Sequence, residues 1–257
     1  MDEKNLVKIF IFFIIIYIIF KPSNYEVEVE YLWDVNHPPN KAKITLNPHF
    51  MYTQSASADD TLPLIIALTG DSAKYENFVN TVFKDFSIPA RVVILESPSR
   101  IWPRRLPEVE FYAQAIAEFA KHLANKYPTT GKPILFGFSG GGMMSYYSAL
   151  THCEAYSIIV PVAGALTSNQ KTYEPLITMD DNCKVVAFHG NKDRAVAFSR
   201  GKKAFEILNN FSKNIEFIEF NGVHLDIFND YNKLIMDKLA QTVTTEVLVS
   251  MVDSNPD

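Results

Sequence analysis

The chain has 257 residues and a net charge of −5; 47% of its residues are hydrophobic and 21% are charged. This length allows one large α/β domain with a substantial core, and the composition is that of a globular protein. The negative charge gives no reason to expect nucleic acid or an anionic membrane surface as a partner. No repeat, low-complexity tract or linker divides the sequence, so we expect a single domain.

An unbroken apolar run, Ile9–Phe20, lies near the N-terminus between lysines. It suits the core of a signal peptide better than a membrane span, which needs about 20 apolar residues. Its N-terminal end is acidic and no Ala-x-Ala-like cleavage site follows, so the sequence leaves open whether the segment is cleaved or stays as an anchor. We therefore expect residues 1–21 to be a signal peptide or a membrane anchor, with membrane association through residues 6–20. Residues 22–257 then form the domain, outside the cytoplasm.

The next stretch predicts antiparallel strands. Tyr25–Tyr31 alternates with period two, as a half-exposed strand does. Lys43–Leu46 and Phe50–Thr53 predict a second strand or a strand pair around Pro48, and the prolines of Asn36–Asn40 indicate a turn. We expect this antiparallel opening to flank the main sheet at one edge.

Buried strands then alternate with helices. Apolar runs predict strands at 62–68, 90–95, 134–136, 156–160, 184–188 and 215–220. Helical spacing predicts helices at 75–86, 108–127, 142–150, 200–210 and about 227–243. This alternation implies right-handed crossovers and a mostly parallel central sheet with helices on both faces, an α/β fold. Ligands of such sheets bind beyond the carboxyl ends of the strands.

The strand at 134–136 leads into Gly137-Phe138-Ser139-Gly140-Gly141 and then into a helix. Gly-x-Ser-x-Gly in this context is a nucleophile elbow, in which a strained turn exposes the serine hydroxyl. Glycines two residues before and after the serine avoid Cβ clashes where strand and helix come close. We therefore expect Ser139 to be the nucleophile and Phe138 to line the acyl side of the site.

Two further polar motifs directly follow the last two predicted strands of the sheet. They are His189-Gly-Asn-Lys-Asp193-Arg-Ala-Val196 and Asn221-Gly-Val-His224. Ser139, Asp193 and His224 therefore occur in the order serine, acid, histidine. Asp180 or Asp181 could instead supply the acid. His189 competes with His224, although it fits better as a structural part of the loop before the acid.

These motifs resemble those of the α/β-hydrolase superfamily, and within it the small secreted esterases and the polyhydroxyalkanoate-depolymerase-like or feruloyl-esterase-like enzymes. Three matches carry the resemblance: Gly-Phe-Ser-Gly-Gly at 137–141, His-Gly-x-x-Asp-x-x-Val at 189–196 and Gly-x-His at 222–224. With the order of the strands they cover roughly residues 25–243. The resemblance implies an α/β-hydrolase fold and a serine hydrolase acting on a small or polymeric ester. It does not fix the subfamily.

The resemblance also implies an oxyanion hole. Its two backbone N–H donors are expected from Gly140, the residue after the nucleophile, and from the loop after the strand at 62–68. Similar enzymes carry His-Gly in that loop, where this chain has Thr69-Gly70, which makes Asp71 the donor by position. This departs from the family pattern, and a carboxylate pointing at the oxyanion would be unfavourable.

The surroundings of the site are less well defined by the sequence. The loop 97–105 carries Trp102 and three arginines. We expect it to overhang the site, with Trp102 touching substrate; the alternative is a solvated basic loop with its tryptophan anchored in the core. The segment between Gly164 and Lys184 is too short for a large lid, so we expect an accessible cleft.

The sequence has two cysteines, Cys153 and Cys183, and leaves open whether they pair or remain separate buried thiols. No cluster of cysteines or histidines has metal-ligand spacing, so we expect no metal and no cofactor.

Together these features predict a serine hydrolase that cleaves carboxylic esters outside the cytoplasm. A serine peptidase or an acyltransferase could use the same triad. A binding protein with a hydrolase fold but no catalysis is a third hypothesis, against which the presence of all three catalytic residue types argues. Acyl and alcohol specificity and oligomeric state stay open.

Overall fold

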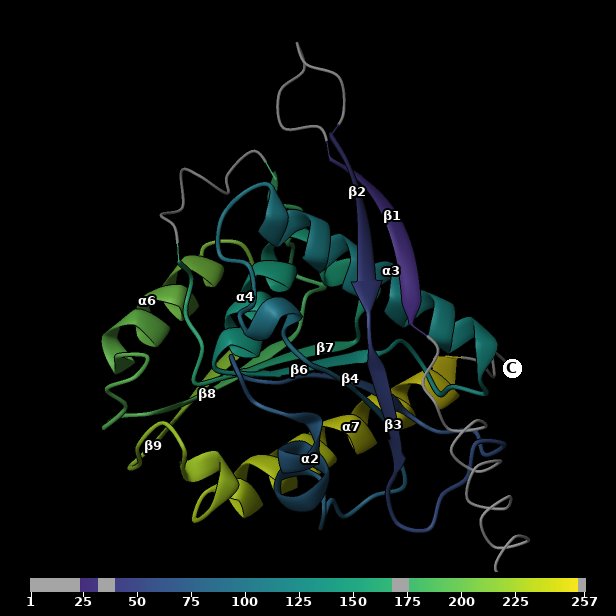
Figure 1. The fold of residues 1–257 in the computed structure, drawn as a ribbon. Helices are drawn as coiled ribbons and strands as arrows, with labels where there is room; N and C mark the ends of the chain where they lie inside the picture. The colour runs from purple at the N-terminus through teal and green to yellow at the C-terminus, as the bar shows by residue number, and fades with distance from the viewer. Residues whose placement is uncertain (1–23, 32–39, 168–175, 254–257) are drawn as a thin grey trace, which may run out of the picture.

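The computed structural model describes residues 24–31, 40–167 and 176–253, and a seven-stranded sheet lies at its centre (Figure 1). The strand order is β3-β5-β4-β6-β7-β8-β9, with β3 antiparallel to β5 and all other neighbours parallel. The strands are β3 (Pro48–Tyr52), β4 (Leu64–Leu68), β5 (Arg91–Leu95), β6 (Ile134–Phe138), β7 (Ile158–Val162), β8 (Val185–Gly190) and β9 (Ile215–Phe220). This confirms the expected, mostly parallel α/β sheet.

Helices cover both faces of the sheet and enclose two apolar cores (Figure 1). One core packs under α3 (Glu108–Lys126), α4 (Gly140–Thr151) and α6 (Phe198–Leu208). The other packs under α7 (Asn232–Asp253) and the segment that starts with α2 (Tyr75–Asn77). Leu64, Ile66 and Leu68 of β4 face the first core, while Ile65 and Ala67 face the second. Burial on both faces explains why such strands are continuous apolar runs.

The first two strands form a separate antiparallel sheet. Along β1 (Tyr25–Tyr31), Val27 and Val29 are buried in the core around α3, together with Ile44 and Leu46 of β2 (Asn40–Leu46). Figure 1 shows this ribbon lying against α3. The prediction that the whole N-terminal stretch flanks the main sheet is therefore right only for β3. The predicted turn at 36–40 falls almost entirely outside the described residues.

Two predicted helices end or begin elsewhere. The helix expected at 75–86 is α2 followed by a π-helix, Phe78–Val82, which closes with a hydrogen bond from Phe83 N–H to Phe78 O of 2.9 Å. This wide turn lets Phe78, Phe83 and Phe86 all enter the core. The last helix, expected from about 227, begins at Asn232, because the chain before it forms the loop that carries His224 and a 3₁₀ turn, Asp226–Phe228.

Cys153 and Cys183 form a disulfide, with Cα atoms 5.7 Å apart. Cys153 begins a 3₁₀ turn, Cys153–Ala155, just after α4, and Cys183 lies just before β8. The bond closes a loop with a sequence separation of 30. A cross-link of this span stabilises the fold by about 3.5 kcal/mol on the chain-entropy estimate.

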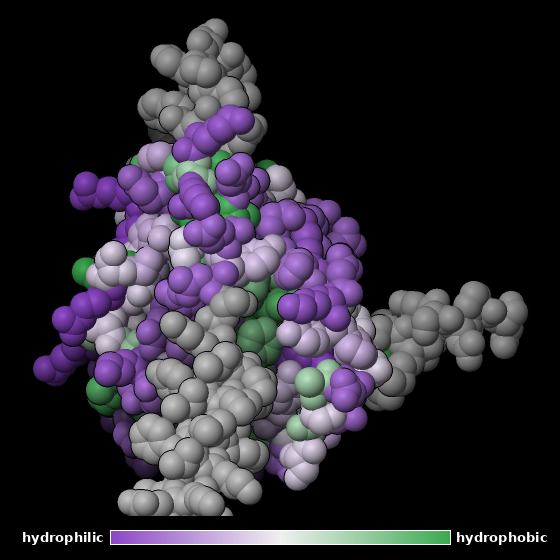
Figure 2. Space-filling view, turned by 45° about the vertical axis from the view of Figure 1, so that its right-hand side comes forward, coloured by the Kyte–Doolittle hydropathy of each residue, from purple (hydrophilic) through white to green (hydrophobic). Residues whose placement is uncertain are grey.

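The face of the molecule in Figure 2 is mostly hydrophilic, with hydrophobic atoms in small separate patches. Within the described ranges no helix is long and apolar enough to cross a membrane, and the apolar run at 9–20 lies outside them. The same ranges hold no group of three or more His, Cys, Asp or Glu side chains arranged to hold a metal ion.

Candidate active site

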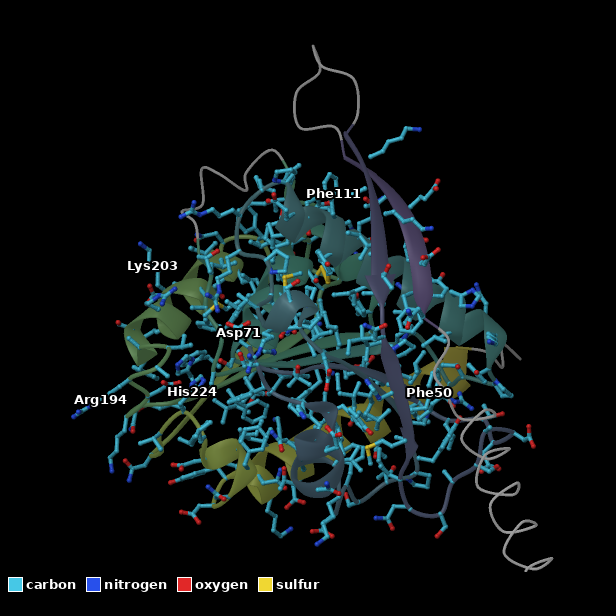
Figure 3. The ribbon with its side chains drawn as sticks, viewed as in Figure 1. Phe50, Asp71, Phe111, Arg194, Lys203 and His224 are labelled. Atoms are coloured by element: carbon cyan, nitrogen blue, oxygen red, sulfur yellow. A yellow bond between two sulfur atoms is a disulfide. The ribbon has the colours of Figure 1, made fainter. Side chains whose placement is uncertain are left out.

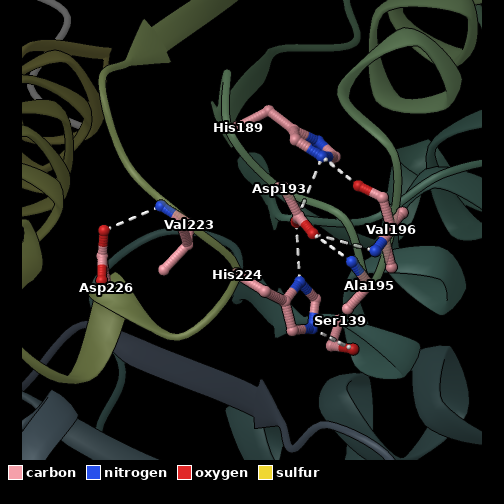
Figure 4. A network of polar contacts seen from close by, with 8 residues as sticks. All are labelled: Ser139, His189, Asp193, Ala195, Val196, Val223, His224 and Asp226. Atoms are coloured by element: carbon pink, nitrogen blue, oxygen red, sulfur yellow. Dashed lines mark hydrogen bonds and ion pairs between the residues drawn. The ribbon is translucent and has the colours of Figure 1, made fainter.

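The three residues predicted to form the triad meet beyond the carboxyl ends of β6, β8 and β9 (Figure 4). His224 Nε2 lies 2.9 Å from Ser139 Oγ, and His224 Nδ1 lies 2.7 Å from Asp193 Oδ2. An ionised carboxylate only accepts hydrogen bonds, so Nδ1 carries the ring proton and Nε2 is left to accept the serine proton. This geometry allows the imidazole to act as a base toward the hydroxyl while the carboxylate fixes its tautomer.

Ser139 occupies the tight turn between β6 and α4. Its backbone is at φ 55°, ψ −113°, a conformation that costs on the order of 1–3 kcal/mol and needs support from its surroundings. Its N–H donates to Val162 O on β7 at 2.9 Å. A Cβ on Gly137 would lie 2.2 Å from Gly141 O, and one on Gly141 would lie 2.4 Å from Leu68 O. The close approach of β6 to α4, and of α4 to the end of β4, therefore requires glycine at these two positions.

Asp193 is buried in the loop after β8 and is held by several donors. Its Oδ1 accepts hydrogen bonds from Ala195 N–H and Val196 N–H, each at 2.9 Å, and its Oδ2 accepts from His224. Burial alone would raise the pKa of Asp193, but hydrogen bonds from His189, His224 and Val196 together hold it well below its usual range. Asp193 is therefore a fixed negative charge behind the imidazole.

The alternative acids are engaged elsewhere. Asp180 accepts hydrogen bonds from the backbone and side chain of Asn182, and Asp181 accepts from Lys213 N–H at 2.9 Å. The structure thus brings Asp193 to His224, and places Asp180 and Asp181 in the turn before β8.

The two predicted oxyanion donors lie side by side. Gly140 is the first residue of α4, where an N–H has no acceptor within the helix. Asp71 reaches the same place from the loop after β4: a Cβ on Gly140 would lie 2.3 Å from Asp71 Oδ1. Gly141 N–H donates to Thr69 O at 3.2 Å and ties this loop to the helix. The start of α4 also favours negative charge through the helix dipole.

The negative charge of the Asp71 carboxylate is paired with a positive charge. Its Oδ1 accepts a hydrogen bond from Trp102 N–H at 2.9 Å, and its Oδ2 pairs with the guanidinium of Arg104. Figure 3 shows Asp71 and His224 near the same end of the sheet, whereas Arg194 and Lys203 point into solvent. The Asp71 carboxylate alone would repel a nearby oxyanion, as expected from the sequence. The positive charge of Arg104 reduces this repulsion.

Trp102 supports the loop after β4. Its side chain is 1% exposed, and its indole N–H donates to Thr69 O at 2.7 Å. Ser72 N–H donates to Arg100 O at 2.7 Å, so the loop 97–105 holds both sides of Asp71. This burial favours the interpretation of a tryptophan anchored in the core, and the expected contact of Trp102 with substrate stays a prediction.

Phe138 is buried and packs against the ring of His224. Its side chain is 3% exposed, its ring lies 5.0 Å from the His224 ring, and it meets Phe228 edge-on at 5.1 Å. Its expected role on the acyl side stays a prediction. A small, partly open hollow lies along α4, one to two turns beyond Ser139. Its lining is mostly apolar: Pro103, Arg104, Val109, Met143, Tyr147, Leu166 and Thr167.

The sequence did not indicate three features of this site. One is the pairing of Arg104 with Asp71, and another is the fit of the Asp71 carboxylate over Gly140. The third is the contact of His189 with the acid: His189 Nε2 lies 3.4 Å from Asp193 Oδ2. The sequence indicated only that His189 is a structural part of the loop before the acid, not that it contacts Asp193.

Comparisons with known proteins identify the family and the fold. The family described as phospholipase/carboxylesterase matches residues 109–243, more than half of the chain. No curated protein matches the sequence. Among solved structures, esterase PE8 is 17% identical with a TM-score of 0.60, and the pair covers 78% of this chain and 98% of that one.

Two further structures share the fold. Acyl-protein thioesterase 2 of Zea mays is 16% identical with a TM-score of 0.58, covering 78% of this chain and 98% of its own. Est1E from Butyrivibrio proteoclasticus is 12% identical with a TM-score of 0.59, covering 86% of this chain and 99% of its own. The sheet, the elbow and the family match together confirm the resemblance to α/β-hydrolases. The chain belongs to the phospholipase/carboxylesterase family.

Proposed function

We propose that the protein is a serine hydrolase that cleaves carboxylic esters through an acyl-enzyme. The observation that carries this proposal is the unbroken hydrogen-bonded path from Ser139 Oγ through His224 to Asp193. A serine hydroxyl is a weak nucleophile alone, and a base at 2.9 Å is what it needs.

In this proposal each group has a step in the reaction. Ser139 Oγ attacks the ester carbonyl while His224 Nε2 takes its proton, and the N–H groups of Gly140 and Asp71 receive the oxyanion. Collapse of this intermediate breaks the bond to the alcohol, which leaves with the proton from His224. Water then repeats the sequence on the acyl-enzyme, releases the acid and restores the serine.

The family and the named esterases among the similar folds support an ester rather than a peptide bond. The thioesterase among them makes thioesters the first related substrates to test. An acyltransferase would use the same acyl-enzyme with an alcohol in place of water. We expect short acyl groups to be preferred, because the hollow beside α4 is small and each added CH₂ contributes about 0.8 kcal/mol only while it is buried.

The protein acts outside the cytoplasm in this proposal, with residues 1–21 as leader or anchor and residues 22–257 as the catalytic domain. The apolar run at 9–20 supports this, and so does the disulfide between Cys153 and Cys183, since such bonds persist mainly in oxidising compartments. N-terminal sequencing of the protein from its natural cells would distinguish a cleaved leader from a retained anchor.

The full-length chain should hydrolyse p-nitrophenyl esters with a kcat/KM that is highest for short acyl groups and falls toward palmitoyl. Matched acyl thioesters, peptide substrates and alcohol acceptors test the neighbouring chemistries. A fluorophosphonate should label the protein. Labelling without turnover of any ester would favour a peptidase or transferase, and neither labelling nor turnover in folded protein would favour a binding protein.

Replacing Asp71 by alanine should lower kcat roughly 10- to 100-fold with little change in KM, because a displaced donor stabilises the oxyanion poorly. Asp71→Asn should retain more activity, since its amide oxygen can still accept Trp102 N–H. Asp59→Ala is the matched control, because Asp59 is exposed in a turn before β4. Equal kcat values for Asp71→Ala and the control would show that this side chain does not position the oxyanion loop.

A further inference from the structure

A second histidine contacts the carboxylate of Asp193 from the side opposite His224 (Figure 4). His189 lies near the end of β8 and is completely buried. Its Nε2 lies 2.9 Å from Val196 O and 3.4 Å from Asp193 Oδ2. One ring nitrogen therefore faces both ends of the short loop that carries the acid.

The surroundings of His189 determine where its proton lies. A carbonyl only accepts hydrogen bonds, so the contact with Val196 O places the proton on Nε2. The other nitrogen, Nδ1, is buried and has no hydrogen-bond partner within the described residues. A Cβ on Gly201 would lie 2.1 Å from it, so α6 closes against that edge of the ring. A proton on Nδ1 would be a buried donor without an acceptor, so this geometry disfavours a donor at Nδ1 and favours one at Nε2.

We propose that His189 is a positioning residue for the catalytic acid: as a neutral donor it orients the Asp193 carboxylate toward His224 and moderates the negative charge that His224 experiences. The inference rests on the proposed function, because it assigns a role within the same triad. It goes beyond packing, since a leucine could fill the cavity but could not donate to Asp193.

The electrostatic consequence has a definite sign. His189 Nε2 lies 3.4 Å from Asp193 Oδ2, and the positive end of its N–H dipole at that distance favours the ionised form of the carboxyl. Without this donor the carboxylate attracts a proton on His224 more strongly. Imidazolium then persists to higher pH, and the base form that must accept the serine proton is lost earlier on acidification.

Few other charges face this pair of rings. Phe198 of α6 and Phe217 of β9 pack around His189, and Phe138 packs on His224. The remaining charged side chains on α6, β9 and the loops that carry Asp193 and His224 are exposed or partly exposed: Lys192, Arg194, Arg200, Lys202, Lys203, Glu206, Glu216, Glu219 and Asp226. Asp193 is thus the buried charge between the two histidines.

The test compares His189→Leu, which removes the donor, with His189→Gln, whose amide N–H can replace it. NMR of histidine-labelled full-length protein follows the titration of His224 without any substrate. We expect the midpoint to rise by roughly half a pH unit in His189→Leu and to return toward the wild-type value in His189→Gln. The acid limb of kcat/KM should move by the same amount, with kcat lowered and KM little changed.

A coincident His224 titration in the wild type and His189→Leu would overturn the proposal even if esterase activity is confirmed. If His189→Leu does not fold, the wild-type spectrum still decides: the neutral His189 ring should carry its proton on Nε2, and a neutral ring protonated on Nδ1 would contradict the proposal. Absence of ester hydrolysis alone would count against the proposed function and would leave this measurement intact.

Discussion

Ser139→Ala should lower kcat for ester hydrolysis by roughly a million-fold, as loss of the nucleophile does in other serine hydrolases. Without the hydroxyl no acyl-enzyme forms, and only substrate binding and the oxyanion donors remain to act on an attacking water. The variant should fold normally, because the strained turn is set by the surrounding glycines and by Ser139 N–H, which donates to Val162 O. Initial rates on a short p-nitrophenyl ester measure the effect, and labelling by a fluorophosphonate should disappear.

Two further variants make this measurement specific. Ser199→Ala removes an exposed hydroxyl at the start of α6 and should leave both turnover and labelling unchanged. The double variant Ser139→Ala/His224→Ala should be no worse than Ser139→Ala, since a base without its nucleophile contributes nothing further. Substantial turnover by Ser139→Ala would assign the chemistry to another group.

The strands, the elbow and the predicted triad residues could be expected from the sequence because their signals are local. Gly137 and Gly141 flank Ser139 within five residues, and the carboxyl ends of parallel strands necessarily face the same side of the sheet. Asp193 and His224 directly follow β8 and β9, so topology alone brings them toward the elbow. The order of the motifs along the chain and the order of the strands in the sheet therefore predict which residues meet at the candidate site.

What surrounds the site could not be predicted in the same way, because it depends on pairs that are distant in the sequence. Arg104 lies 33 positions from Asp71, and nothing in either segment marks the other as its partner. Trp102 illustrates the same limit: an aromatic residue in a basic loop is compatible with a substrate contact and with a buried anchor, and only tertiary packing distinguishes them.

The differences between the predicted and the observed fold also come from contacts between distant parts of the chain. The alternation of Tyr25–Tyr31 indicates one buried face, but not whether a sheet or a helix covers it, and here α3 does. The phenylalanines at 78, 83 and 86 fit a helical pattern imperfectly, and the π-helix turns all three toward the core. In the second case burial against the rest of the chain overrides a local preference for a regular α-helix.

Asp193→Asn should lower kcat about ten-thousand-fold while leaving KM nearly unchanged. The substitution keeps the shape of the side chain, but its amide nitrogen is a donor where His224 Nδ1–H needs an acceptor. The ring then favours the tautomer with its proton on Nε2, which cannot accept the proton of Ser139. The expected result is a large loss of turnover in a protein of nearly normal stability, measured as kcat beside a thermal melt.

Asp181→Asn is the matched control, because Asp181 accepts a hydrogen bond from Lys213 N–H away from the triad; its kcat should equal that of the wild type.

The lowered pKa of Asp193 adds a test based on pH. A carboxyl with a lowered pKa stays ionised in mild acid, and its contribution to stability is lost only below the ordinary aspartate value, about 3.9. Loss of wild-type activity between pH 5 and 7 would therefore not reflect protonation of Asp193. A variant Asp193→Asn with wild-type kcat would remove Asp193 from the mechanism and reopen the choice of acid.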